Sequence, residues 1–168
     1  MPSSVSRSPT LRFAGQLALT TALGTIATLG YGRRAYAGSC NPVSSVFLCT
    51  GPADPAGDVT QSISGSNLVV RTETGFGLDT STSGGAGFDL TGTGGLTFDG
   101  LLPDLSITAA DTGLRLVNTG GAVSIDTRGG AVTGQTGDGI SVYNTGTSTS
   151  VTTGSVSGYQ YGLVVRNM

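Results

Sequence analysis

One six-residue pattern occurs three times in the C-terminal third of this 168-residue chain. Each copy reads Gly, apolar, any residue, apolar, any residue, Asn, and the copies span 113–118, 139–144 and 162–167. The alternation predicts a strand with one buried face. The copies begin 26 and 23 residues apart, a spacing typical of repeats in which each unit covers the apolar face of its neighbour. We therefore expect an all-β solenoid of stacked coils.

The asparagine of each copy has the same parity as the apolar residues before it. Asn118, Asn144 and Asn167 should therefore point inward, and a buried amide is costly unless it is hydrogen-bonded. Stacked coils remove this cost because each Asn can bond the Asn above and below it. We predict a structural asparagine ladder at one corner of the coils. A ligand groove lined by the three amides is the alternative, which the inward parity disfavours.

Residues 61–168 as a whole fit the solenoid. Between residues 75 and 104 a pattern of about ten residues recurs, with Leu78, Phe88 and Phe98 in equivalent places. Ten residues suit one side of a coil plus a turn, so two or more such units would make one coil. Residues 123–127 and 131–133 are the expected further sides of a later coil. At 20–26 residues per coil we expect roughly five coils.

Residues 1–37 have the organisation of a helical signal peptide. A basic start with Arg7 and Arg12 precedes an apolar stretch at 13–30, and Ala35-Tyr36-Ala37 supplies a cleavage pattern before Gly38. A membrane anchor is the alternative, but Gln, Thr and Gly dilute the apolar stretch. We expect an exported protein whose mature part is not inserted in a membrane.

The only two cysteines, Cys40 and Cys49, follow directly after the predicted cleavage site. In an exported chain such a pair predicts a disulfide, which would stabilise a loop this short by about 2–3 kcal/mol. A redox role is the weaker alternative because the spacing is not Cys-x-x-Cys. We expect residues 38–60 to form an N-terminal cap that contains the disulfide loop and shields the first coil.

The composition weighs against several functions. The chain has no His and no Lys, so the commonest general base and metal ligand is missing. Beyond residue 37 there are four Arg and ten acidic residues, which gives a net charge of −6. An acidic surface disfavours nucleic acid as a partner. We expect no cofactor and no catalysis.

Three patterns keep chemical alternatives open. Gly84 to Asp89 matches the start of a calcium-binding nonapeptide, but Thr91 stands where an aliphatic residue belongs, so we predict no metal site. For a carbohydrate-active enzyme, Asp126 and Asp138 would have to approach one another. Arg115 and Arg166 would share an outward row. A serine triad is excluded within this chain because it has no His and no Gly-x-Ser-x-Gly elbow.

The signal peptide, the Cys-x8-Cys pair and repeats of the form Asp138-Gly139-Ile140-x-Val142-x-Asn144 resemble the passenger of a type V autotransporter. The resemblance implies a right-handed parallel β-helix that is displayed at the cell surface or outside the cell. It also implies an outer-membrane barrel in a full-length form, of which this chain would be an N-terminal portion. The implied function is adhesive or structural, with surface glycans or proteins as partners. A pectin-lyase-like β-helix enzyme is the alternative.

Overall fold

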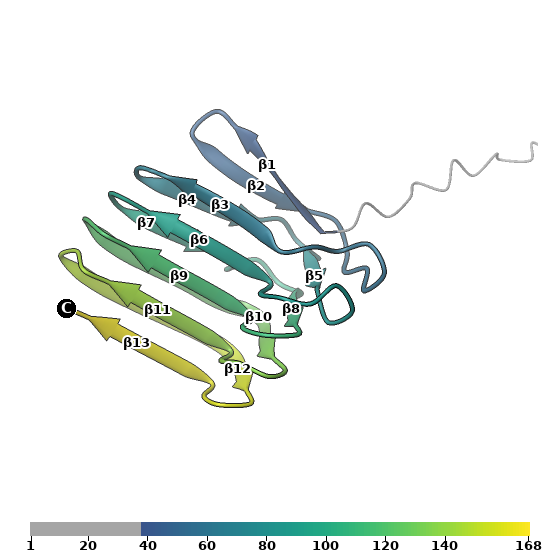
Figure 1. The fold of residues 1–168 in the computed structure, drawn as a ribbon. Coiled ribbons are helices and arrows are strands. Elements are labelled where there is room, and N and C mark those ends of the chain that lie inside the picture. Colours follow the sequence, from purple (N-terminus) through teal and green to yellow (C-terminus); the bar gives the residue numbers. More distant parts are fainter. Residues whose placement is uncertain (1–37) are drawn as a thin grey trace, which may run out of the picture. The chain divides into compact units, whose positions relative to one another are not determined.

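A computed structural model describes residues 38–168, and the predicted signal peptide lies outside this range. The described residues form strands and turns without a helix, so they hold no helix that could cross a membrane. Figure 1 shows the strands stacked in successive layers. The thirteen strands are β1 (Ser39–Val43), β2 (Val46–Thr50), β3 (Gln61–Gly65), β4 (Leu68–Thr72), β5 (Gly77–Asp79), β6 (Phe88–Gly92), β7 (Leu96–Asp99), β8 (Leu105–Ala109), β9 (Leu114–Asn118), β10 (Ala122–Gly134), β11 (Ile140–Asn144), β12 (Ser148–Gly158) and β13 (Leu163–Asn167).

The first four coils each run along three sides of a parallel β-solenoid, and β13 adds the first side of a fifth. The first side is a five-stranded sheet in the order β13-β11-β9-β6-β3. The second side contains β4, β7 and the first halves of β10 and β12, and the third side contains β5, β8 and the second halves of β10 and β12. All of these neighbours pair in parallel. The first side has one strand per coil, which confirms the solenoid of about five turns expected from the repeats.

The register of the first side extends the six-residue pattern by two coils toward the N-terminus. Gln61 stacks on Phe88 and Phe88 on Leu114, and the stack continues through Ile140 and Leu163. The sequence pattern missed the first two strands because Gly65 and Gly92 stand where the later copies have Asn.

The apolar residues of the alternation fill the interior. Leu78, Phe88 and Phe98 are fully buried and lie on the third, first and second sides respectively. The ten-residue units are therefore single sides plus a turn, as predicted. The ring of Phe88 lies 5.2 Å from that of Phe98, edge-on, and 6.0 Å from that of Phe76, so aromatic rings pack against one another inside the first two coils.

Two long strands cover two sides each. β10 and β12 pair with each other over both sides, with a shift of register between Thr127 and Ala131 at the corner. In the preceding coils the same corner is a loop, between β4 and β5 and between β7 and β8. Residues 123–127 and 131–133 are thus two sides of one coil, as expected, although one continuous strand carries them.

A glycine precedes the first side of four coils because successive backbones approach closely there. A Cβ atom added to Gly113 would lie 2.6 Å from the carbonyl oxygen of Gly139, and one added to Gly139 would lie 2.6 Å from that of Gly162. These contacts are with backbone, which cannot move aside without disturbing the stack. The repeated glycine is therefore a requirement of stacking.

The segment before the coils forms a cap of two parts. β1 and β2 pair antiparallel as a hairpin, and β2 continues the second side by pairing in parallel with β4. The loop that follows is held by Asp58, whose buried Oδ2 accepts hydrogen bonds from the backbone N–H groups of Asp54 (2.9 Å) and Asp79 (2.6 Å). The cap thus contacts both the second and the third side of the first coil.

Candidate functional site

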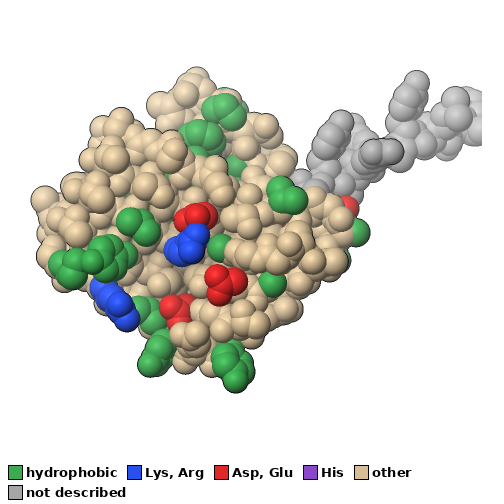
Figure 2. Space-filling view, in the orientation of Figure 1, with side chains coloured by type: hydrophobic (Ala, Val, Ile, Leu, Met, Phe, Trp, Pro, Cys, Tyr) green, Lys and Arg blue, Asp and Glu red, His purple; other side chains and the backbone are tan. Residues whose placement is uncertain are grey.

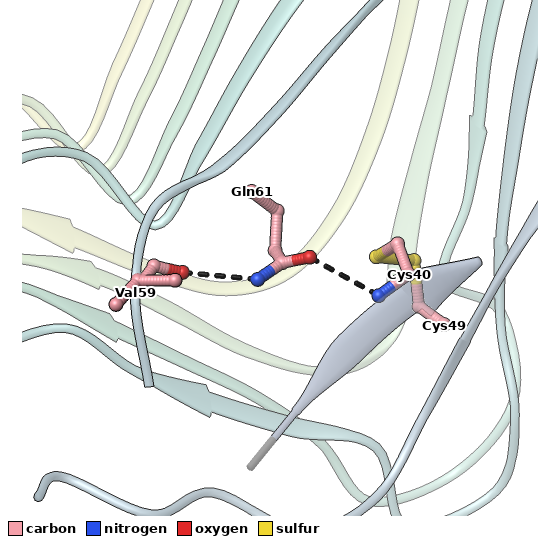
Figure 3. Close-up of a disulfide and its surroundings, with 4 residues drawn as sticks. All are labelled: Cys40, Cys49, Val59 and Gln61. Carbon is pink, nitrogen blue, oxygen red and sulfur yellow. Dashed lines mark hydrogen bonds between the residues drawn. A yellow bond between two sulfur atoms is a disulfide. The ribbon is translucent and has the colours of Figure 1, made fainter. Parts of the chain in front are cut away.

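The disulfide joins Cys40 and Cys49, which are directly opposite one another in the β1–β2 hairpin. Cys49 is fully buried. Figure 3 shows how Gln61 ties this hairpin to the first coil: its Oε1 accepts the N–H of Cys40 at 3.1 Å, and its Nε2 donates to the carbonyl oxygen of Val59 at 3.0 Å. The predicted disulfide is confirmed, and the hydrogen bond from the Cys40 N–H to Gln61 attaches the disulfide-bonded hairpin to the first coil.

The three asparagines lie in one row at the end of the first side. Asn118 Nδ2 donates to Asn144 Oδ1 at 2.9 Å, and Asn144 Nδ2 donates to Asn167 Oδ1 at 3.0 Å. Asn118 and Asn144 are fully buried, whereas Asn167 is exposed. The amides point into the solenoid and bond each other from coil to coil, so they line no groove.

Asn144 also organises the turn that follows it. Its Oδ1 accepts the N–H of Gly146 at 2.9 Å, and its Nδ2 lies 2.8 Å from the carbonyl oxygen of Ser148 and 3.0 Å from Thr149 Oγ1. The alternation predicts the direction of the side chain but not these partners, because they depend on the path of the turn. The ladder therefore fixes the corner between the first and second sides as well as the distance between coils.

Charged side chains are sparse on the outer face of the first side and gather near its middle (Figure 2). Arg115 makes a two-pronged ion pair with Asp89 of the neighbouring coil, with distances of 3.1 Å from Nε to Oδ1 and 2.6 Å from Nη2 to Oδ2. This hydrogen bond raises the pKa of Arg115, and the nearby Asp111 carboxylate adds to the rise. The guanidinium is already occupied by a carboxylate and is not free to bind an anion.

The second side carries two further ion pairs on its outer face. Arg71 Nε lies 3.3 Å from Asp99 Oδ2, and Arg128 Nη2 lies 2.6 Å from Asp126 Oδ2. The hydrogen bonds from Arg128 lower the pKa of Asp126, and the same contact raises the pKa of Arg128. Both pairs are largely exposed, so each contributes little to stability.

The residues required by the enzyme alternative do not converge. Asp126 lies on the second side and is held by Arg128, whereas Asp138 lies in the turn before β11, beyond the third side of the same coil. The expectation that Arg115 and Arg166 share one row is wrong. Arg115 is aligned with Ser141, and Arg166 is aligned with Tyr143, two residues further along β11.

The calcium-like segment is a turn that leads into β6. Gly84 and Gly85 adopt positive φ angles of 77° and 97°, which suits glycine in a tight turn. Asp89, the first acidic residue of the motif, is bonded to Arg115. Across residues 38–168 no three acidic or cysteine side chains gather in a way that would hold a metal ion.

The third side presents a surface of a different kind. Its outward positions on β8 and on the second halves of β10 and β12 are Ser106 and Thr108, Ala131 and Thr133, and Ser155 and Ser157, which align in two rows. We refer to these six residues as the hydroxyl face. None of the six is charged, and Thr133 Oγ1 lies 3.1 Å from Ser157 Oγ. Sequence reasoning missed this surface because it requires the register of three coils.

Neither models of protein families, nor curated proteins, nor solved structures match this chain.

Proposed function

We propose that this chain is an exported β-helical surface module, a portion of an autotransporter passenger, with an adhesive or structural role and no catalysis of its own. The observation that carries the proposal is the construction of the solenoid. Its coils are joined inside by the Asn118–Asn144–Asn167 ladder and closed at the start by a disulfide-bonded cap. A disulfide is stable in the oxidising conditions outside the cytoplasm.

The outer surface supports a binding role more than a catalytic one. The ion pairs Asp89–Arg115, Arg71–Asp99 and Asp126–Arg128 occupy three of the four arginines beyond residue 37. Small hydroxyl side chains cover much of the remaining sheet surface. Such ladders form extended contact surfaces on solenoids, and surface glycans or proteins are the partners we propose.

Attachment to an outer-membrane barrel is tested in the genome that encodes the chain. If the chain is part of an autotransporter, the DNA downstream of codon 168 should encode about a dozen amphipathic barrel strands. That reading frame should be continuous with codon 168 or separated from it by a recent mutation that interrupts the frame. Unrelated sequence downstream in every close relative of the gene would contradict the autotransporter assignment.

The binding role is tested with the 168-residue chain after its export. We expect it to adhere to cells or extracellular matrix in a plate assay, and to show no lyase or hydrolase activity on polygalacturonate and neutral polysaccharides. Turnover of such a polymer, lost in Asp126→Asn or Asp138→Asn, would favour the enzyme alternative. Failure to adhere to any surface would contradict a role as an adhesin.

A further inference from the structure

The hydroxyl face differs from the other two sides in its charge. The outward positions of the first side include the Asp89–Arg115 pair, and those of the second side include Arg71–Asp99 and Asp126. On the third side, the outward positions of β8, β10 and β12 hold only Ser, Thr and Ala, and Asp79 of β5 continues the row of Thr108 at the N-terminal end of this face. The six residues of the hydroxyl face give an anionic ligand no positive partner, and both Asp79 beside the face and the net charge of −6 beyond residue 37 repel such a ligand.

The rows of this face recur with the stacking of the coils. Successive parallel strands lie about 4.8 Å apart, which is close to the advance of one pyranose unit in an extended β-linked glycan chain. Each hydroxyl both donates and accepts hydrogen bonds, as the hydroxyls of a sugar do. The row Thr108, Thr133, Ser157 therefore offers one hydroxyl side chain per coil to a ligand that lies along the solenoid axis.

An exposed aromatic ring stands at the edge of the same face. Tyr159 follows Ser157 by two residues, and its N–H bonds the carbonyl oxygen of Gly134 in the neighbouring coil. The residue is 81% exposed. An aromatic ring offers an apolar face on which the C–H side of a pyranose packs, while its hydroxyl remains wet. The exposed Gln135 is aligned with Tyr159 in the neighbouring coil, and its amide can both donate hydrogen bonds to sugar hydroxyls and accept hydrogen bonds from them.

We propose that the hydroxyl face, with Tyr159 at its edge, binds one extended chain of a neutral β-1,4-linked hexose polysaccharide. The chain lies along the solenoid axis with one sugar on each of β8, β10 and β12, and a terminal sugar packs against Tyr159. This assignment rests on the proposed function, because it names the ligand class of a surface-binding module.

The probes are neutral β-1,4-linked oligosaccharides of two to six units from the cello- and manno- series, titrated by calorimetry into the 168-residue chain after its export. We expect affinity to rise up to three or four units and then to stay level, because three coils carry the face. Tyr159→Ala should weaken binding at least about tenfold. Thr133→Val should weaken it as well, because it keeps the branched shape of the side chain and removes the central hydroxyl. Tyr161→Ala is the matched control, since Tyr161 is also exposed, at 64%, but precedes the first side.

The inference is overturned if no neutral hexaose binds, if Tyr159→Ala and Thr133→Val bind as the parent does, or if oligogalacturonate binds as well as the neutral sugars. All three substitutions are at the surface, and circular dichroism with the thermal midpoint verifies that the variants are folded. A parent chain that adheres to cells but binds none of the sugars would leave the proposed function standing and remove this inference. Binding of the sugars without adhesion to cells would support this inference and contradict the proposed adhesive function.

Discussion

Replacement of Asn144 by Ala tests whether the ladder holds the coils together. The change removes an amide group, with two N–H donors and one acceptor oxygen, from a fully buried corner and leaves Asn118 Nδ2 without its partner in the next coil. It also removes the hydrogen bonds within the turn, to Gly146, Ser148 and Thr149, and the bond to the exposed Asn167. A net hydrogen bond contributes about 1 kcal/mol, and a stranded buried group costs about 1–3 kcal/mol. Because Asn118 Nδ2 keeps its bond to the carbonyl oxygen of Gly120, we expect a loss of about 3 kcal/mol.

The assay is equilibrium unfolding in urea, followed by far-ultraviolet circular dichroism and tyrosine fluorescence, since the chain has no Trp and five Tyr. Asn167→Ala is the matched control: it removes the same side chain from an exposed end of the row, and we expect a loss below about 1 kcal/mol because water replaces its bonds. The reasoning is refuted if the two variants are equally stable, or if Asn144→Leu is as stable as the parent, since either result would mean that the row only fills space.

Three further predictions concern the cap, a surface ion pair and the glycine corner. Cys40→Ser should lower the free energy of unfolding by about 2–3 kcal/mol. Hydrogen exchange of the variant should show that the backbone amides of the first coil exchange faster than those of the fourth coil, which contains β11 and β12. Arg128 lowers the pKa of Asp126. The contribution of this ion pair to folding stability is therefore fully present above a pH of about 4, and it is lost as the pH falls through the lowered pKa. The difference in urea midpoint between the parent and Asp126→Asn should therefore be small at pH 7, since the pair is exposed, and should shrink as the pH falls through the lowered pKa of Asp126. Gly139→Ala, whose Cβ would lie 2.6 Å from a backbone oxygen, should destabilise by about 1–3 kcal/mol. Gly65→Ala, with no atom within 4 Å of its Cβ, should change the thermal midpoint little, and equal effects at the two sites would contradict the close approach.

The location of each inward side chain followed from local rules. Period-two alternation assigned Leu114, Leu116 and Asn118 to one face of a strand, and the structure buries all three. The recurrence of the pattern indicated stacking, and the position of the cysteines after the predicted signal peptide indicated their pairing. These predictions succeed because strand parity and cysteine chemistry depend on neighbours in the sequence.

The alignment of outward residues was predicted only in part. Parity alone suggested one outward row for Arg115 and Arg166, but Arg115 is the third residue of its copy of the six-residue pattern and Arg166 the fifth, and Arg166 stacks on Tyr143. The third side of the third and fourth coils is the second half of a longer strand, which no ten-residue unit marks. Register depends on the length of every turn between two coils, and those turns vary.

The amino-acid sequence alone thus determined that this chain forms stacked coils with an inward row of asparagines and a disulfide near their start. Only the tertiary structure decided which outward residues meet: Asp89 with Arg115, Asp126 with Arg128, and Thr133 with Ser157. The physical reason is that burial of a side chain is set within one strand, whereas a surface on a solenoid is made of one or two residues from each coil. Its chemistry exists only once the coils are in register.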